Sequence, residues 1–273
     1  MHRLSGKIHQ ISPLTIAQVT DIHLFHKENH KLLGMQTLDS FYTAIERLKE
    51  LRNEIDLLLL TGDLSSDGSA ESYEYLQNLL KSLNIPTYWL PGNHDKPDVM
   101  GSVLGLGLIS KRKSFIRGGW HFILLDSSVA ECVHGYLNSQ TLNWLDSELT
   151  QVANLPTVVA LHHPPFLVNS QWLDRSNLQN PDALFTVLDR HPQVHLVLSG
   201  HIHQEFHYQR QNVDYLGTPS TCIQFEPESQ EFAIDHNFPG FRLFKLYPDG
   251  NWNSWVERVS YTTNCLDFAA AGY

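Results

Sequence analysis

This chain is 273 residues long, and hydrophobic residues make up 42% and charged residues 18% of it, which excludes an intrinsically disordered protein. Its formal net charge of -10 argues against diffuse nucleic-acid binding, because such binding needs a basic surface that neutralises phosphates. Carboxylates that surround bound cations would contribute to the same negative total.

Short apolar runs alternate with amphipathic stretches through most of the chain. In order, we predict a strand in TIAQVTD (from Thr15), a helix along Leu38, Phe41, Ile45 and Leu48, a strand in DLLLLTGD (from Asp56), a helix along Tyr73, Leu76, Leu80 and Leu83, and a strand in TYWLPGNHD (from Thr87). There follow a strand in HFILLDSS (from His121), a helix in LNSQTLNWLDSEL with Asn138 and Ser139 as its cap, a strand in TVVALHHPP (from Thr157), a helix in NPDALFTVLDR (from Asn180) and a strand in VHLVLSGHIH (from Val194).

After Glu205 the helical signal stops. FHYQRQNVDYLGTPS and FRLFKLYPDGNWNSWVERV each predict a hairpin, the second one turning at Asp249–Gly250. Strands that alternate with helices and are apolar on both faces indicate an α/β (α+β) fold whose sheets are covered. We find no repeat, low-complexity tract or linker and expect one domain, residues 1–273, with its core at about 15–260.

The cysteines and the chain start indicate a cytoplasmic protein. Cys132, Cys222 and Cys265 are far apart and form no CxxC pair, so neither a disulfide framework nor a thiolate zinc site is expected. The N-terminal MHRLSGKIHQISP has no apolar core and is not typical of a signal peptide. No apolar run approaches the roughly 18 residues of a membrane span, so we expect no membrane partner.

Five predicted strands end in residues that can bind metals. In an open α/β sheet, ligands bind beyond the carboxyl ends of the strands. The residues at these ends include no lysine or arginine, and they are Asp21, His23, Asp63, Asn93, His94, His162, His201 and His203.

Carboxylates that converge without counter-charges repel one another, and a divalent cation between them removes this repulsion. Seven donors are too many for one first-row metal and suit two, and oxygen and imidazole donors without thiolate fit Fe, Mn or Zn. A shared carboxylate would hold the ions about 3.5–4 Å apart. Residues i and i+2 of a strand exit point to the same side, so we expect His201 and His203 to ligate one metal each. Taken singly, each motif has a plain alternative as a turn or a packing pair.

The order DxH, GD, GNHD, HH and GHxH resembles the pattern of the calcineurin-like metallophosphoesterases. Here it reads Asp21-Ile22-His23, Gly62-Asp63, Gly92-Asn93-His94-Asp95, His162 and Gly200-His201-Ile202-His203. Further segments, most specifically WLD, GHIHQE, TPSTCIQF and PGFRLFKLYPDG, are similar to the bacterial class III 3′,5′-cyclic-AMP phosphodiesterases of that family. The similarity runs from about Ile16 to Val259 and implies a four-layer αββα sandwich, two mixed sheets packed face to face with helices outside.

The resemblance also implies roles for the residues. One metal would be held by Asp21, His23 and His203, the other by Asn93, His162 and His201, with Asp63 bridging them. It implies hydrolysis of 3′,5′-cyclic AMP to 5′-AMP by a metal-bridging hydroxide, which forms near neutral pH because a metal lowers the pKa of its water to about 7 in the zinc case. His94 would contact the phosphate and act as general acid.

The remaining candidates have weaker signals. Asn93 and Asp63 join His94 as catalytic candidates, and Asn93, His94, His134 and His203 are the candidates for substrate binding. His134 in VHGYL is otherwise an ordinary loop histidine, and we expect His163 to be structural and Thr218 and Ser220 to line the substrate side. Residues 166–180 suit a cap over the nucleotide, with Phe166 or Trp172 stacking on adenine or packing under the loop.

Several functions compete with this one. A protein Ser/Thr phosphatase would have GDxxDRG, whereas this chain has no arginine between Gly62 and Gly68. Phosphodiesterases of broader specificity, acting on 2′,3′-cyclic nucleotides or glycerophosphodiesters, share the metal ligands and stay open. A non-catalytic scaffold on this fold would typically lack ligand histidines. The sequence leaves the metal, the cyclic nucleotide and the choice of monomer or homodimer undecided.

Overall fold

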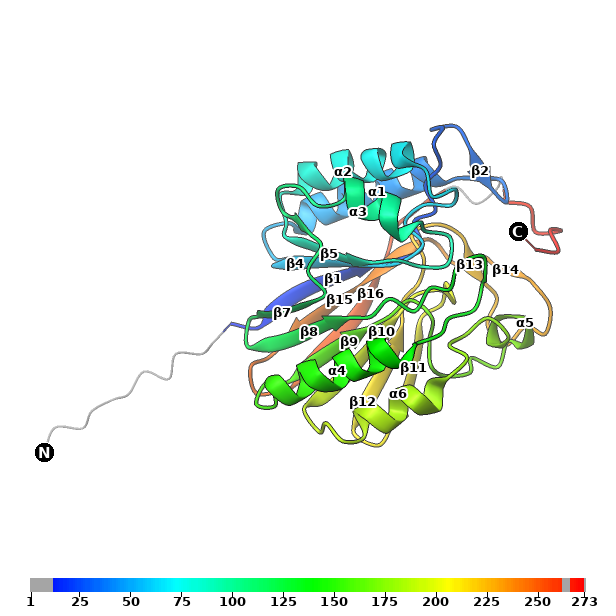
Figure 1. The fold of residues 1–273 in the computed structure, drawn as a ribbon. Helices are drawn as coiled ribbons and strands as arrows, with labels where there is room; N and C mark the ends of the chain where they lie inside the picture. The colour runs from blue at the N-terminus through cyan, green and yellow to red at the C-terminus, as the bar shows by residue number, and fades with distance from the viewer. Residues whose placement is uncertain (1–11, 262–265, 273) are drawn as a thin grey trace, which may run out of the picture.

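The computed structural model describes residues 12–261 and 266–272, so the N-terminal segment and Cys265 lie outside the described residues. Two six-stranded mixed sheets pack face to face, with helices on both outer faces (Figure 1). The predicted four-layer αββα sandwich is therefore confirmed. Each of the six predicted buried strands, four helices and two hairpins is present.

The first sheet has the order β16-β15-β1-β4-β5-β6. β1, β4, β5 and β6 are parallel, and the hairpin of β15 and β16 continues the sheet, with β15 antiparallel to β1 and β16 antiparallel to β15. The bounds are β1 Leu14–Val19, β4 Leu57–Thr61, β5 Thr87–Leu90, β6 Ile109–Ser110, β15 Gly240–Leu246 and β16 Trp252–Arg258.

The second sheet has the order β11-β12-β10-β9-β8-β7. Its four central strands are parallel, whereas β11 and β7 run antiparallel to their neighbours at the two edges. The bounds are β7 Ser114–Arg117, β8 Trp120–Leu124, β9 Thr157–Ala160, β10 Val194–Ser199, β11 Phe206–Arg210 and β12 Val213–Gly217.

Helices cover the outer face of each sheet. Figure 1 shows α1 (Thr37–Leu51), α2 (Ala70–Leu83) and α3 (Pro97–Val103) over the first sheet, and α4 (Ser139–Gln151) and α6 (Pro181–Leu188) over the second. The predicted cap of α4 is confirmed, because the side chain of Asn138 accepts the backbone N–H of Thr141 at 2.9 Å.

Alternation along β4 explains why its sequence is apolar throughout. Leu57 and Leu59 belong to the buried cluster between the two sheets, together with residues of β8, β9 and β10. Leu58 and Leu60 belong to the cluster beneath the helices of the first sheet. Successive side chains of a strand point to opposite faces, so a strand in the middle of four layers buries both sets.

The predictions missed only short elements. These are β2 (Lys31–Leu32), β3 (Met35–Gln36), β6, β7, α3, α5 (Gln171–Asp174), β13 (Gln224–Phe225) and β14 (Ile234–Asp235). Pieces of two to seven residues give too few repeats for a period to be read from the sequence. In Figure 1, β13, β14 and α5 lie at the same end of the molecule.

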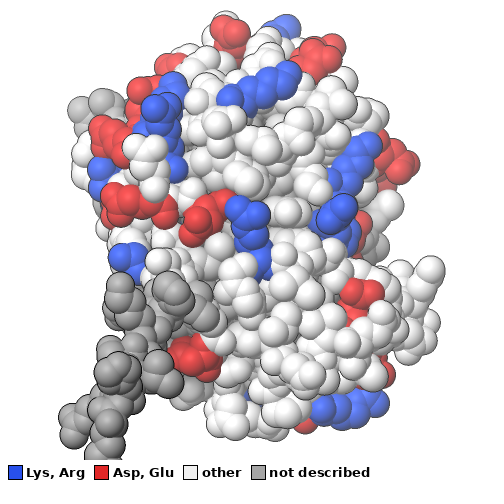
Figure 2. All heavy atoms as spheres, turned by 90° about the vertical axis from the view of Figure 1, so that its left-hand side faces the viewer, with Lys and Arg blue, Asp and Glu red and all other residues white. Residues whose placement is uncertain are grey.

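The exterior carries charges of both signs. Figure 2 shows lysine and arginine side chains interspersed with aspartate and glutamate over one face. Among the helices of the described part of the chain, none is long and apolar enough to cross a membrane.

Candidate metal centre

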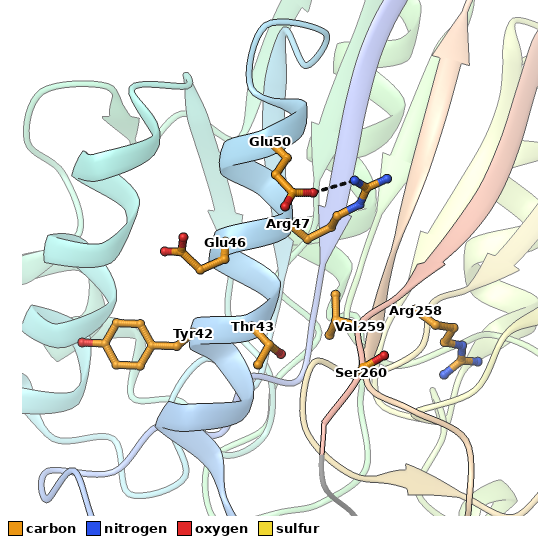
Figure 3. Close-up of a pocket in the computed structure, with 8 residues that line it drawn as sticks. All are labelled: Tyr42, Thr43, Glu46, Arg47, Glu50, Arg258, Val259 and Ser260. Atoms are coloured by element: carbon orange, nitrogen blue, oxygen red, sulfur yellow. Dashed lines mark hydrogen bonds and ion pairs between the residues drawn. The ribbon is translucent and has the colours of Figure 1, made fainter.

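One surface hollow contains none of the predicted residues. It lies between α1 and the end of β16, has a volume of about 420 Å³, and is lined by Tyr42, Thr43, Glu46, Arg47, Glu50, Arg258, Val259 and Ser260 (Figure 3). Arg47 is engaged there, because its guanidinium donates to Glu50 at 2.7 Å and lies 3.1 Å from Glu257. The predicted residues meet instead beyond the carboxyl ends of the parallel strands.

Asp21, His23 and His203 form one group of potential ligands, with their ligand atoms within 4.8 Å of one another. Nε2 of His203 lies 3.2 Å from Oδ1 of Asp21 and 3.3 Å from Nε2 of His23. All three side chains are buried. The loop after β1 in the first sheet and the loop after β10 in the second sheet therefore meet at a single point, as the sequence predicted.

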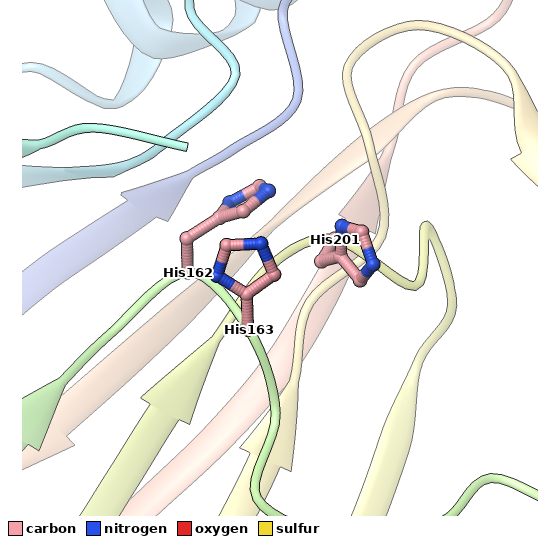
Figure 4. A group of neighbouring side chains, drawn as sticks. All are labelled: His162, His163 and His201. Atoms are coloured by element: carbon pink, nitrogen blue, oxygen red, sulfur yellow. The ribbon is translucent and has the colours of Figure 1, made fainter. Parts of the chain in front are cut away.

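His162 and His201 form a second group, together with His163 (Figure 4). The rings of His162 and His201 are 5.1 Å apart and nearly perpendicular. Asn93 joins them, because its Oδ1 lies 3.2 Å from Nε2 of His162. These residues follow β5, which lies in the first sheet, and β9 and β10, which lie in the second.

Asp63 stands between the two groups. Its Oδ2 is 3.2 Å from Nε2 of His162 and 3.9 Å from Nε2 of His23, so one carboxylate faces both. Its Oδ1 accepts the backbone N–H of His94 at 2.9 Å. This is the placement that a bridging ligand requires, and the bridging role itself stays a prediction.

Many of these residues have a left-handed backbone. Asp21, His23, Asp63, His201 and His203 have φ between 50° and 69°, a region that non-glycine residues rarely adopt. Such strain is retained where surrounding contacts over-determine it, and it gathers at functional sites. The backbone hydrogen bonds from Asp21 to Gly62 (3.0 Å) and from His23 to Asp63 (3.0 Å) hold two of these loops in register.

Glycines allow the loops to approach each other. A Cβ on Gly92 would lie 2.2 Å from Oδ1 of Asp63, and a Cβ on Gly200 would lie 2.1 Å from Oγ1 of Thr20. Both glycines precede candidate ligands in the sequence motifs. The glycine of GNHD and of GHxH is thus required by close packing of backbone against a neighbouring side chain.

His201 and His203 do not belong to a strand exit with strand geometry, so the prediction that they share one side of it was wrong. β10 ends at Ser199, and both histidines lie beyond it with φ of 69° and 50°, so strand alternation does not apply. The expectation that they serve different groups fits the geometry: His203 lies with Asp21 and His23, and His201 lies with His162. The turn of the loop, rather than the pleat of a strand, separates them.

Burial and the neighbouring charges shift the pKa values strongly. Burial would raise the pKa of Asp63, but His162, His94 and His23 together hold it well below its usual range. Burial would lower the pKa of His162, but the carboxylates of Asp63 and Asp21 overcome it and raise the pKa to about 9. Burial lowers the pKa of His23 to about 3. Strongly perturbed groups gathered in one place are typical of a functional site.

The donor set fits two metal ions. Oxygen and imidazole donors converge on Asp63. Among the described residues, the ion-pair partners of Asp21 and Asp63 are all histidines. Nδ1 of His162 donates to the carbonyl of Thr61 at 2.9 Å, and Nδ1 of His203 donates to the carbonyl of Ile223 at 2.8 Å. Backbone partners of this kind orient the ring of a metal-ligating histidine and leave Nε2 for the metal.

Two cavities meet at His94 and Asn93. The first has a volume of about 820 Å³ and is lined by His201, Ser176, Arg175, the aromatic side chains of Trp172, Phe225 and Phe232, and residues 269–272. The second, of about 800 Å³, has a mixed lining in which apolar side chains such as Val99, Val129 and Val133 accompany the polar and charged side chains of Ser66, Asp67, Lys96, Asp98, Asp126, Ser128 and Glu131. The half-buried ring of His94 thus stands where both cavities reach the candidate metal groups.

The two aromatic residues expected over the nucleotide have different positions. Trp172 lines the first cavity. Its ring packs edge-on against those of Phe225 and Phe232, with ring centres 4.8 and 5.0 Å apart. Phe166 is buried and stacks on Phe206, with the two ring centres 4.9 Å apart, so it packs beneath the 166–180 segment. Of the two, only Trp172 is placed to meet a ligand.

Thr218 and Ser220 do not line the substrate side, contrary to expectation. Both are fully buried: Thr218 donates to Gln18 at 2.7 Å and Ser220 to the carbonyl of Asp21 at 2.6 Å. Through these hydrogen bonds, Thr218 and Ser220 hold β1 and the loop of Asp21 in place. His163 hydrogen-bonds Ser127 at 2.8 Å and the carbonyl of Val133 at 3.0 Å, which agrees with a structural role.

His134 receives no support from the cavities. Its neighbour Val133 lines both of them, whereas the residues that line them do not include His134. Its substrate contact stays a prediction.

Two further residues of the site were missed from the sequence. Asp95 is buried and accepts the N–H groups of Leu64, Ser65 and Gly92 as well as the hydroxyl of Tyr73, so it ties the loop of Asp63 to the loop of Asn93. Its presence in GNHD was the available signal. Ser176 contacts His201 at 3.0 Å, and no motif in the sequence marks it.

Comparison with known proteins agrees with this geometry. The family model for calcineurin-like phosphoesterases matches residues 14–205. A 3′,5′-cyclic-nucleotide phosphodiesterase of Nostoc sp. is 61% identical over 92% of this chain and 94% of its own. The 3′,5′-cyclic adenosine monophosphate phosphodiesterase CpdA of Escherichia coli K12 is 37% identical over 94% of each chain. A crystal structure of a dimetal phosphatase from Danio rerio covers 91% of this chain and all of its own with a TM-score of 0.68 at 16% identity, which shows a shared fold.

Proposed function

The chain belongs to the calcineurin-like phosphoesterase family, and on this basis we propose that it is a dinuclear-metal phosphodiesterase that hydrolyses 3′,5′-cyclic AMP to 5′-AMP. The observation that carries the proposal is the position of Asp63 between two groups of imidazole and oxygen donors, next to Asn93 and His94, which line two cavities. The substrate class is supported by relatives of 61% and 37% identity that are named as cyclic-nucleotide phosphodiesterases.

We propose Asp21, His23 and His203 as the ligands of one ion, and Asn93, His162 and His201 as the ligands of the other, with Asp63 shared. Their oxygen and nitrogen donors suit Fe, Mn or Zn. When bound, such ions supply a nucleophile at neutral pH and neutralise charge on the phosphoryl oxygens.

The protein's own residues would then bind and protonate the substrate. The side chain of His94 projects beside both cavities, and its backbone is fixed by the hydrogen bond from its N–H to Asp63. From there it would contact the phosphate and donate a proton to the departing ribose oxygen. Asn93, half-buried beside His162, would contact the same phosphate.

The aromatic cavity suits the adenine base. Trp172, Phe225 and Phe232 provide π-faces and edges, and Arg175 is the one lysine or arginine among the residues that line this cavity. Stacking of a base on aromatic side chains stabilises binding by about 1–3 kcal/mol per base. This cavity would therefore hold the nucleoside while the phosphate lies at His94.

The second cavity favours an additional, broader activity. A cyclic diester of a nucleoside has both ester oxygens on one ribose, whereas a linear diester carries a second, separate substituent on the phosphorus. The second cavity, which His94 also lines, provides space for the second substituent. Glycerophosphodiesters, which are linear, are the alternative substrates that this cavity favours, and 2′,3′-cyclic nucleotides are the alternative cyclic substrates that we would test beside them.

The proposal includes the whole chain. Candidate ligands come from loops of both sheets, which supports one domain over residues 1–273. We propose a cytoplasmic enzyme that acts as a monomer or homodimer on a small cyclic nucleotide, without nucleic-acid or membrane partners.

A substrate panel on metal-reconstituted protein tests this function. The panel consists of 3′,5′-cAMP, 3′,5′-cGMP, 2′,3′-cAMP, glycerophosphocholine and nitrophenyl mono- and diesters, each with Fe, Mn or Zn. We expect the highest kcat/KM for 3′,5′-cAMP. Higher kcat/KM for glycerophosphocholine or 2′,3′-cAMP would establish the broader activity instead, and no diester hydrolysis with any metal would refute the proposal.

A further inference from the structure

Ser176 contacts a candidate ligand from outside the family motifs. Its Oγ lies 3.0 Å from Nε2 of His201, and it also donates its hydroxyl proton to the carbonyl of Leu173 at 2.8 Å. A serine hydroxyl has a single proton to donate. Because Leu173 takes that proton, the remaining role of Oγ toward the imidazole is that of an acceptor.

We propose that Ser176 is a positioning residue that holds His201 in the tautomer with the proton on Nε2, so that Nδ1 is the nitrogen offered to a metal. The inference rests on the proposed function, in which His201 is a ligand. In a neutral histidine, the hydrogen bond made by one ring nitrogen decides which nitrogen is left as the ligand.

His201 differs in this respect from the two histidines beside it. His162 and His203 donate from Nδ1 to the backbone carbonyls of Thr61 and Ile223, which leaves Nε2 for a metal. A backbone carbonyl persists whatever the side chain at that position. The partner of His201 is a side-chain hydroxyl, so this orientation is the one of the three that a single substitution can remove.

The 166–180 segment holds Ser176 in place. The side chain of Asp174 accepts the N–H of Val168 at 2.8 Å, and the buried Asn177 donates to the carbonyl of Phe166 at 2.7 Å. The N–H of Leu178 donates to the carbonyl of Pro164 at 3.1 Å. These bonds fold the segment onto itself directly after His162 and His163, and they set the hydroxyl of Ser176 at the wall of the aromatic cavity.

The 166–180 segment therefore has two roles in this proposal. Trp172 and Arg175 face the cavity expected to hold the base, and Ser176 orients a metal ligand. Loss of the Ser176 hydroxyl should weaken one of the two metal sites by about 10- to 100-fold, the usual effect of removing the hydrogen-bond partner of a ligating histidine. The other site, at Asp21, His23 and His203, should keep its affinity.

The test compares Ser176→Ala with a matched control, Ser170→Ala. Ser170 lies in the same segment and is fully buried, and its hydroxyl has no hydrogen-bond partner among the described residues. Metal stoichiometry and affinity are measured by calorimetry and chelator competition. We expect Ser176→Ala to lose affinity at one site of two with a lower kcat and little change in KM, Ser170→Ala to match the wild type, and Ser176→Thr, which keeps the hydroxyl, to restore binding.

The tautomer is measured independently of metal binding and activity. Long-range proton–nitrogen NMR spectra of the metal-free wild type should show the His201 proton on Nε2, and Ser176→Ala should lose this preference. A proton on Nδ1 in the wild type, or equal metal affinities of Ser176→Ala and Ser170→Ala, would overturn the inference. A wild type that binds fewer than two ions would instead refute the proposed function, and the NMR result would still decide the role of Ser176.

Discussion

The backbone N–H of His94 donates to Oδ1 of Asp63 at 2.9 Å, so the proposed acid and the proposed bridging ligand are joined through the main chain. The other oxygen of the same carboxylate faces His162 at 3.2 Å. Asp63 thus orients the loop that carries His94 and also presents an oxygen to the candidate metal groups.

Asp63→Asn should separate these two roles. Asparagine keeps an oxygen that can accept the N–H of His94 but removes the charge shared by both ions. We expect cAMP hydrolysis to fall by at least about 100-fold and metal content to fall below two ions per chain. Asp146→Asn, on α4 where Asp146 pairs with Arg190 and His191, is the control and should change neither quantity. Full metal content in Asp63→Asn would contradict the bridging role.

His94→Ala should affect substrates according to their leaving group. A general acid contributes about 10²- to 10⁴-fold when the leaving oxygen needs a proton. We therefore expect a loss in that range for 3′,5′-cAMP, a much smaller loss for bis-nitrophenyl phosphate, and unchanged metal content. His191→Ala, which removes a ring that pairs with Asp146 of α4 at 2.7 Å and lines neither cavity, should behave as the wild type. Equal losses for both leaving groups would argue against proton donation by His94.

Trp172→Leu should weaken binding of the base. Trp172 lines the aromatic cavity and contacts Phe225 and Phe232 at their edges. Loss of stacking worth about 1–3 kcal/mol should raise KM for cAMP by roughly tenfold or more. The KM for a nitrophenyl diester should change little. Trp255→Leu, on the half-exposed face of β16, serves as the control. An unchanged KM for cAMP would place the base elsewhere.

Gly92→Ala should abolish the site by steric conflict. The new Cβ would lie 2.2 Å from Oδ1 of Asp63 and 2.4 Å from its backbone nitrogen, and real Cβ atoms do not approach so closely. We expect loss of metal and activity together with a lower melting temperature. Gly101→Ala, in α3, would meet only Trp89 at 3.9 Å and should stabilise the fold by about 0.5–1 kcal/mol, since alanine favours a helix. A fully active Gly92→Ala would show that these loops have room to move.

Lys113→Met should change how stability depends on pH. Burial lowers the pKa of Lys113 to about 7, and its ammonium lies 3.5 Å from the centre of the Trp89 ring. The unfolded chain, with a lysine pKa of about 10.4, binds more protons between about pH 7 and pH 10. The contribution of Lys113 to the free energy of unfolding therefore rises with pH between about pH 7 and pH 10. Below about pH 7 the folded chain bears the full free-energy cost of burying the charged ammonium.

Guanidinium unfolding of the wild type and Lys113→Met at several pH values measures this effect. The free energy of unfolding of the wild type, relative to the variant, should increase from pH 7 to pH 9.5. The comparison cancels the groups that both proteins share. A difference that stays constant with pH would mean that Lys113 keeps its charge when folded.

The sequence determined the layers and the meeting point of the candidate ligands. Leu57 to Leu60 are apolar on both sides of β4 because that strand lies inside four layers, and this pattern is local to the strand. Asp21, Asp63, His162 and His201 follow parallel strands directly, and parallel strands of a sheet end at one edge. Period and position therefore placed Asp21 beside Asp63 and His162 beside His201, whereas the meeting of the two sheet edges was implied only by the family resemblance.

Only the tertiary structure decided how they face one another. The left-handed backbone of His201 and His203, the four hydrogen bonds to Asp95 and the contact of Ser176 with His201 join loops that are distant in the sequence. Thr218 and Ser220 were misplaced for the same reason, since their partners are Gln18 and Asp21. Loops have no period, and their conformations follow from contacts with other segments, which a one-dimensional pattern does not contain.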